Sequence, residues 1–270
     1  MLTPAELRGN IVAVPILSPL AYQAQLMNTP QDGYDLNRHL PGKPQMFLSH
    51  RLAHLIYHGR LWPCDYVIDP HANSSPAVRC AIVKGTADQT IKDISRELAD
   101  AFGITTIEMV YEHEKHRTGT MVEGALADGK LCLVLELLYQ RRIDENFVRT
   151  GVRGILNVLR KLQMIDGEIE EQTDMPVIEQ RLSRVELTAK LGGLVSWFKT
   201  AGEAAASGAK VGLIRGPWGD VVKEIYSPRD GWMLAWPLLA NQAATAGDFL
   251  ASIAMPWTSR KGLARCSAID

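Results

Sequence analysis

The segment from Asp32 to Gly42 has the strongest chemical character in the sequence. Glycine and proline bound it, which predicts a loop. Within it, Asn37 offers amide donors and acceptors, and Arg38 offers a planar fork that can hold a carboxylate at two points. Composition alone also allows an ordinary surface turn with an exposed arginine, so the interpretation needs support from other parts of the sequence.

Two more candidates follow apolar runs that are typical of buried strands. His71 comes soon after residues 66–68, and Glu136 directly follows residues 131–135. Folds of the α/β class bind ligands beyond the ends of such strands. A carboxylate in a partly desolvated cleft has a raised pKa, which suits a general base. The alternatives are a lone loop histidine and an exposed glutamate that ends a strand.

The other histidines are weaker candidates. His50, His54 and His58 share one face of a predicted helix, but no glutamate stands between them as in a HExxH zinc site. His113 and His116 lie in a charged loop that we expect to be solvated.

Alternating elements must position these residues. Hydrophobic periodicity predicts strands at residues 11–16, 66–68, 81–83, 105–110 and 131–135, and helices at 47–58, 90–102, 120–127 and 144–164. Thr90 is the expected cap of the second helix, and Gly103 its expected end. The alternation predicts an α/β fold with a mixed, mostly parallel sheet flanked by helices.

The pattern changes after Gly167. A polar linker at residues 168–172 precedes short β-rich pieces separated by frequent glycines, which indicate a small antiparallel barrel or sandwich. We therefore expect a core domain at residues 1–167 and a β-rich C-terminal barrel-sandwich domain at 173–256.

Several segments resemble one family of zinc hydrolases. Residues 35–38, followed by Pro41, resemble the substrate-carboxylate loop of the zinc carboxypeptidase superfamily. Residues 4–15 and 141–160 resemble, more narrowly, the succinylglutamate desuccinylase/aspartoacylase family. The likeness extends from about residue 4 to about residue 253 and implies a carboxypeptidase-like core.

Two motifs of the family are matched with departures. The segment that ends in His71 is similar to the family's Asp-Leu-His, with Pro70 in place of leucine. Glu136 is similar to the glutamate of the family's Val-Glu-Leu-Gly-Gly, but Leu137 and Leu138 partly replace the glycines.

The resemblance implies a zinc-dependent amidohydrolase that releases a carboxylic acid from an N-acyl amino acid. Asn37 and Arg38 would bind the substrate carboxylate, His71 would be the third zinc ligand, and Glu136 would be the general base. The expected cofactor is therefore zinc.

The family's first zinc element, His-Gly-x-Glu, lies upstream of the segment that begins here at Pro4. We therefore expect an N-terminally truncated chain whose hydrolysis is impaired, because catalytic zinc normally takes three protein ligands. The alternatives are a non-catalytic carboxylate-binding pseudoenzyme, a truncated fragment, or a metal site rebuilt from His71 with His39 or Asp69.

Composition narrows the partners. The formal net charge of -1 gives no basis for binding a nucleic-acid backbone, and no apolar run approaches the length of a membrane span. The four cysteines are scattered, which favours a reducing, cytoplasmic location. We expect a small-molecule substrate, and a homo-oligomer that covers the sheet edge which the missing segment would expose.

Overall fold

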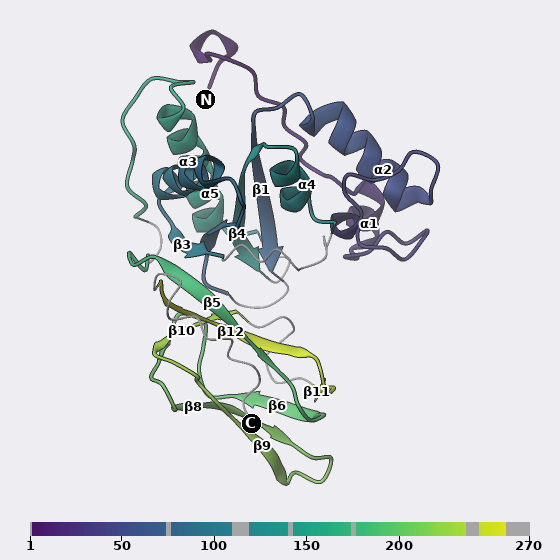
Figure 1. Ribbon diagram of the computed structural model, residues 1–270, viewed down its shortest axis with the longest axis vertical. Coiled ribbons are helices and arrows are strands. Elements are labelled where there is room, and N and C mark those ends of the chain that lie inside the picture. The colour runs from purple at the N-terminus through teal and green to yellow at the C-terminus, as the bar shows by residue number, and fades with distance from the viewer. Residues whose placement is uncertain are drawn as a thin grey trace.

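A large mixed sheet and a smaller antiparallel sheet form the framework of the protein (Figure 1). The structure, a computed structural model, describes residues 2–73, 77–109, 119–139, 143–173, 177–235 and 243–257. Within these residues, no helix is long and apolar enough to cross a membrane. The predictions for His113 and His116 lie outside the described residues.

The larger sheet has eight strands in the order β1-β4-β2-β3-β5-β12-β10-β7. The bounds are β1 Tyr66–Asn73, β2 Cys80–Val83, β3 Thr105–Glu108, β4 Leu131–Tyr139, β5 Leu182–Thr188, β7 Ala204–Ala205, β10 Gly231–Ala235 and β12 Phe249–Pro256. β1 and β4 are parallel, as are β2 with β3 and β3 with β5, whereas β2 and β4 are antiparallel. The predicted α/β fold with a mixed sheet is confirmed.

Helices cover both faces of the α/β part of this sheet. The helical bounds are η1 Pro4–Glu6, α1 Pro19–Ala24, η2 Leu36–Arg38, α2 Leu48–Ile56, η3 Tyr57–Leu61, α3 Gln89–Phe102, α4 Met121–Ala127 and α5 Glu145–Lys161. α3 and α5 pack on one face through a core that includes Phe102, Leu133 and Val158. α2 and α4 pack on the other face, where Ile82, Val134 and Ile107 lie in a second core. Alternate strand residues therefore belong to different cores, as the two-residue period of a strand requires.

The ends of two helices test the capping predictions. Asp88, and not Thr90, caps α3, because its Oδ1 accepts hydrogen bonds from the backbone N–H groups of Thr90 and Ile91 at 2.9 and 3.1 Å. A carboxylate before the helix satisfies two free N–H groups, whereas Thr90 already lies inside the helix. Gly103 ends α3 in the left-handed conformation, as predicted.

The predicted strand at residues 11–16 is wrong. The segment is not in a strand, and the exposed fractions of Ile11, Val12, Val14 and Ile16 are 50, 49, 39 and 41%. An apolar run forms a buried strand only when a neighbouring strand accepts its backbone hydrogen bonds, and none of the described strands pairs with it. The run therefore passes over the surface as an extended segment.

The second sheet is antiparallel and has the order β11-β6-β8-β9. Its bounds are β6 Gly193–Trp197, β8 Lys210–Arg215, β9 Val221–Tyr226 and β11 Ala243–Ala244. Ile214 of β8 and Ile225 of β9 share a core with Met233 of β10 and Ile253 of β12, so the two sheets form a sandwich (Figure 1). The β-rich C-terminal part predicted from the glycines is present. Its strands β5, β12, β10 and β7 also continue the eight-stranded sheet.

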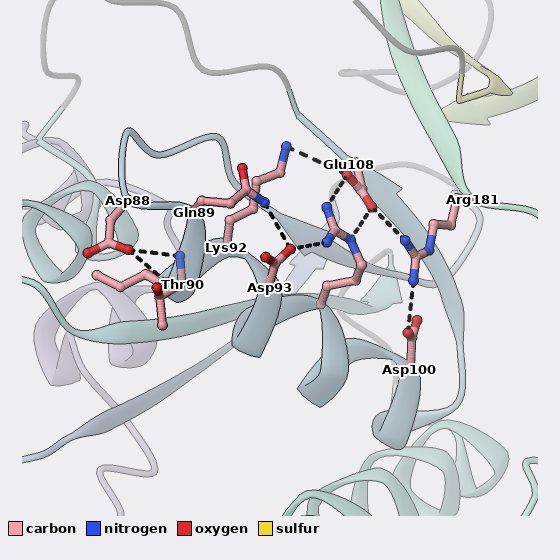
Figure 2. A network of polar contacts seen from close by, with 10 residues as sticks. Asp88, Gln89, Thr90, Lys92, Asp93, Asp100, Glu108 and Arg181 are labelled. Atoms are coloured by element: carbon pink, nitrogen blue, oxygen red, sulfur yellow. Dashed lines mark hydrogen bonds and ion pairs between the residues drawn. The ribbon is translucent and has the colours of Figure 1, made fainter.

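A buried carboxylate connects the two parts of the large sheet. Glu108, at the end of β3, is 1% exposed and accepts hydrogen bonds from Arg96 Nε and Nη2 at 2.6 and 3.0 Å. Lys92 Nζ lies 3.6 Å from Glu108 Oε2, and Arg181 Nη1 lies 3.7 Å from Oε1 (Figure 2). Arg181 directly precedes β5, so Glu108 joins α3, β3 and the start of β5.

The cations around Glu108 outweigh the effect of its burial. Burial by itself raises the pKa of Glu108, but the hydrogen bonds and charge of Arg96, with Lys92 and Arg181, bring that pKa below its usual value. A carboxylate with a lowered pKa stabilises the fold above its unfolded pKa, and this stabilisation disappears as the pH falls through the folded pKa.

We expect Glu108→Gln to lower the free energy of unfolding by about 3 kcal/mol at pH 7, because it leaves Arg96 without its buried counter-ion. The deficit should shrink below about pH 4, where the wild-type carboxylate takes up a proton. Urea unfolding at pH 7 and at pH 3 measures both effects.

Asp100→Asn is the matched control. Asp100 meets Arg181 at 3.3 Å, but its side chain is 50% exposed. An exposed pair of this kind contributes less than about 1 kcal/mol. Equal losses in the two variants would contradict a special role for the buried carboxylate.

Candidate active site

The parallel pairing of β1 with β4 brings two of the predicted site residues together. His71 of β1 lies directly opposite Glu136 of β4. His71 lies four residues after Val67, and Glu136 lies two residues after Val134. Both valines pack in the core beneath α2 and α4. The two side chains therefore lie on the α2–α4 face of the sheet.

A buried aspartate holds the imidazole of His71. Asp69 is 5% exposed, and its Oδ2 lies 3.0 Å from His71 Nε2. This hydrogen bond is the main cause that raises the pKa of His71, with further help from the charges of Asp69 and Glu136, while burial and the charge of Arg38 oppose it. Leu36 of the predicted carboxylate loop packs in the same core as Val134, so the loop lies over the face of the sheet that carries His71 and Glu136.

Glu136 has the environment expected of a base. Burial raises its pKa, although the charges of His71 and Arg184 work in the opposite direction. Asn73 Nδ2 donates a hydrogen bond to Glu136 Oε2 at 2.9 Å, which orients the carboxylate. Cys80 lies opposite Glu136 on β2, and burial raises the pKa of this thiol to about 12, so it remains neutral there.

The loop that carries Asn37 and Arg38 is a short 3-10 turn, η2. Asp35 starts the turn by accepting a hydrogen bond from the Asn37 backbone N–H at 2.9 Å. Asn37 Oδ1 accepts from the Met121 backbone N–H at 2.9 Å, which ties the loop to the start of α4. The Asn37 amide oxygen is thus used within the protein. The Arg38 side chain remains 55% exposed, with Asp35 Oδ2 3.7 Å from its Nη1.

A second anchor ties this loop to α2. Asp32 accepts hydrogen bonds from the backbone N–H and the hydroxyl of Ser49 at 2.6 and 2.9 Å, and the Ser49 hydroxyl also lies 2.9 Å from the Thr29 hydroxyl. Burial alone raises the pKa of Asp32, but the bonds from Ser49 and Tyr34 bring it below its usual value. The loop is therefore held at both ends by buried polar contacts.

The ring of His39 packs among aromatic rings and the ring of His50. Its ring contacts those of Tyr34, Phe47 and His50, with centroids 5.0, 5.5 and 4.4 Å apart. These contacts pack the loop against the start of α2.

His54 of α2 and His58 of η3 also pack against rings. His54 and His58 have centroids 4.4 Å apart, and His58 lies 6.1 Å from Trp62. Within the described part of the chain, these histidines therefore contribute to packing along one helix face.

A family-type zinc centre would require three protein ligands. Across the described residues, no group of three His, Cys, Asp or Glu side chains is arranged to hold a metal ion. Asp69 already engages His71 Nε2. The described donors therefore do not form a three-ligand zinc site, and the role of His71 as a ligand stays a prediction.

Sequence reasoning missed the part played by Asn73. A signal existed, because Asp69, His71 and Asn73 alternate along one strand. The strand register shifts between His71 and Ala72, however, and the contact of Asn73 with Glu136 depends on that irregularity. Sequence periodicity does not reveal such a bulge.

The mixed α/β sheet thus carries an imidazole and a carboxylate side by side, with the arginine loop packed over the same face. The profile of the succinylglutamate desuccinylase/aspartoacylase catalytic domain matches residues 1–162. The chain belongs to the succinylglutamate desuccinylase/aspartoacylase family.

Known proteins agree with this assignment. The N-alpha-acetyl-L-2,4-diaminobutyric acid deacetylase of Halomonas elongata is 26% identical over 208 residues, which cover 71% of this chain and 59% of the relative. The chain thus spans less than two thirds of the length of that relative.

Solved structures show the same fold. A succinylglutamate desuccinylase/aspartoacylase from Rhodobacter sphaeroides is 25% identical and superposes with a TM-score of 0.83 over 95% of this chain and 78% of that one. An ectoine utilization protein from Ruegeria pomeroyi is 18% identical, with a TM-score of 0.79 over 93% and 76% of the two chains.

We expect Gly119→Ala to distort the arginine loop. A Cβ at Gly119 would lie 2.1 Å from the carbonyl oxygen of Arg38, and the φ of Gly119 is +73°. Gly129→Ala is a matched control, because Gly129 has φ +72° and no atom within 4 Å of the added Cβ. Both variants share the cost of the left-handed backbone, so their difference reports the clash with Arg38.

The clash should cost Gly119→Ala about 2 kcal/mol more than Gly129→Ala in urea unfolding. Equal free energies of unfolding for the two variants would show that the arginine loop accommodates the added Cβ without strain.

Proposed function

We propose that this protein is a deacylase-type protein that binds an N-acyl amino acid by its carboxylate. Arg38 is the carboxylate receptor, and Asn37 fixes the loop that presents it. Glu136 is the general base for hydrolysis of the amide bond, and Asp69 and Asn73 orient His71 and Glu136. The pairing of His71 with Glu136, on the face of the sheet where Leu36 of the arginine loop packs, carries this proposal.

The chemistry of each group supports its role. The Arg38 side chain is 55% exposed, and both of its contacts, a hydrogen bond to the Asn37 carbonyl at 2.6 Å and a 3.7 Å approach to Asp35, are made by Nη1, so the rest of its fork can meet an incoming carboxylate. Burial keeps the pKa of Glu136 above its usual value, which makes it a better proton acceptor. The family and the names of its relatives favour an amide of an amino acid as the substrate.

A second candidate function is carboxylate binding without hydrolysis. The donor set around His71 favours it, because the described residues supply no three-ligand group. Hydrolysis by zinc chemistry would need at least two ligands besides His71. The proposed deacylase is therefore expected to be impaired, and zinc content separates the two candidates.

Zinc stoichiometry of the purified protein is the first measurement. We expect clearly less than one tightly bound zinc per chain, because one histidine position gives a weak site. If the protein instead holds close to one zinc per chain, and His71→Ala loses it, this expectation is overturned and a complete metal site is established. In that event the non-catalytic candidate would be rejected.

Binding and hydrolysis should respond to different substitutions. Arg38→Met should weaken binding of N-acetyl amino acids about 10- to 100-fold, because it removes a charge-assisted pair of hydrogen bonds. Glu136→Gln should keep that binding and reduce any hydrolysis at least about 100-fold, because the amide cannot accept the proton.

Calorimetry measures the affinities, and release of the free amino group measures hydrolysis. Arg149→Met is a control, because Arg149 lies on α5 at the opposite face of the sheet and bonds locally to Asn146. Unchanged affinity in Arg38→Met would refute the proposed carboxylate receptor.

A further inference from the structure

Two neighbouring histidines at the end of α2 have no part in the candidate site. His54 lies in the last turn of α2, and His58 lies in η3, which continues that helix. Residues four positions apart lie on the same side of a helix. Their rings are in contact, with centroids 4.4 Å apart and planes tilted by 52°. The fold therefore holds two imidazoles side by side on one helix.

Both rings have free nitrogen atoms. His58 is exposed, and His54 is half-buried. Of the residues that the structure describes, none makes a hydrogen bond or an ion pair with either ring. Besides each other, the rings contact only Tyr57 and Trp62, whose centroids lie 5.3 and 6.1 Å from that of His58. A neutral imidazole without a hydrogen-bond partner keeps one lone pair for a ligand.

The distance between the rings is close to that required by a shared metal ion. Imidazole nitrogens bind zinc at about 2.0–2.1 Å, and with a ring radius of roughly 1 Å two imidazoles on one tetrahedral ion have centroids about 5 Å apart. The observed separation is 4.4 Å. The ring torsion of histidine is broad, so each ring can turn a nitrogen towards a common ion at little cost.

The residues around the pair select the kind of ion. Residues 48–62 contain no aspartate or glutamate, so the helix offers nitrogen ligands and no carboxylate. Asp128, which reaches this helix from the end of α4, accepts a hydrogen bond from the Tyr57 hydroxyl. Ca²⁺ and Mg²⁺ require oxygen ligands, whereas imidazole suits Cu²⁺, Ni²⁺ and Zn²⁺. The pair therefore favours transition metals.

Two nearby cations are held at backbone carbonyl groups. Arg60 Nη1 donates to the Gly59 carbonyl at 2.9 Å. Lys130 Nζ donates to the carbonyls of Trp62 and Cys64 at 2.6 and 2.7 Å. Their charges weaken the attraction of a metal ion, but these groups do not occupy the imidazole nitrogens.

A second histidine pair beside α2 is less accessible. The rings of His39 and His50 also have centroids 4.4 Å apart, but Phe47 contacts both of them at 5.5 and 4.7 Å. His50 Nδ1 is buried without a hydrogen-bond partner. An ion at that nitrogen would have to lose water ligands, which is costly. His50 is therefore a matched control on the same helix.

We propose that His54 and His58 bind a divalent transition-metal ion at the junction of α2 and η3, with Cu²⁺ preferred over Ni²⁺ and Zn²⁺. The two imidazoles supply one nitrogen each, and water fills the remaining positions. The preference for copper follows the general order of affinities of these ions for nitrogen ligands. The site is independent of the proposed function, because it uses neither His71 nor Glu136.

Titration of the purified full chain, without a histidine tag, tests the site. Calorimetry with Cu²⁺, Ni²⁺ and Zn²⁺ gives the affinities. Trp62 supplies a local signal, because it is 53% exposed and its ring centroid lies 6.1 Å from that of His58. Cu²⁺ quenches the fluorescence of an indole that lies close to it. The difference between the wild type and Trp62→Phe isolates this signal.

We expect Cu²⁺ to quench Trp62, and Ca²⁺ and Mg²⁺ to leave its fluorescence unchanged. His54→Gln and His58→Gln should each weaken Cu²⁺ binding about tenfold or more, because a single imidazole lacks the advantage of two linked ligands. Both variants should also lose the quenching. His50→Gln should keep the quenching, with an affinity for Cu²⁺ within about threefold of the wild type.

Thermal melting establishes that each variant is folded. If His54→Gln is unfolded, His58→Gln decides, because its side chain is exposed. Unchanged quenching in His58→Gln would overturn the proposal. Loss of the quenching in a folded His50→Gln, with retention in His58→Gln, would assign the ion to the other pair and overturn it as well.

His71→Ala separates this site from the candidate active site. It should leave the quenching of Trp62 intact, because His71 is not a ligand of the proposed ion. Zinc that His58→Gln loses and His71→Ala retains belongs to the pair on the helix and does not bear on hydrolysis. Loss of the quenching in His71→Ala would contradict an independent site.

Discussion

The parallel register of β1 and β4 is the constraint on which the candidate site depends. It sets His71 opposite Glu136, and the two-residue period then fixes which side chains share their face. Asp69 is buried below His71 because it lies one step earlier on the same strand. A shift of this register by one residue would turn Glu136 towards α3 and α5 and bury its charge in an apolar core.

Buried carboxylates have different surroundings on the two faces of the sheet. On the α3–α5 face, Glu108 is surrounded by cations that it can pair with directly, and its pKa falls. On the α2–α4 face, Glu136 accepts a hydrogen bond from the Asn73 amide, and burial raises its pKa. A carboxylate that is paired with cations has a low pKa and is a weak base. A buried carboxylate with fewer cationic partners has a higher pKa and accepts a proton more readily. The proposed site therefore lies where, among the described residues, the buried carboxylate has fewer cationic partners.

Much of this could be predicted from the sequence, and the misses have physical causes. An apolar five-residue run such as residues 131–135 predicts a central strand, because a strand that is buried on both faces is apolar throughout. The same rule failed at residues 11–16, since apolar composition does not supply a pairing partner. His71, Glu136, Asn37 and Arg38 could be chosen as candidates by residue type and family resemblance. The hydrogen bond from Asn73 to Glu136 could not be foreseen, because it joins β1 and β4, which are distant in sequence and pair with an irregular register.

The continuous sheet gives the β-rich part a direct connection to the site. β5 pairs with β3 on one side and with β12 on the other, so one strand belongs to both the α/β core and the sandwich. Arg184 lies on this shared strand, and its charge acts on both Glu136 and Lys84. Glu108 fixes the start of the same strand through Arg181, from the opposite face of the sheet. The strand shared with the sandwich therefore places the positive charge of Arg184 on the α2–α4 face, two residues beyond Leu182, where it acts on Glu136.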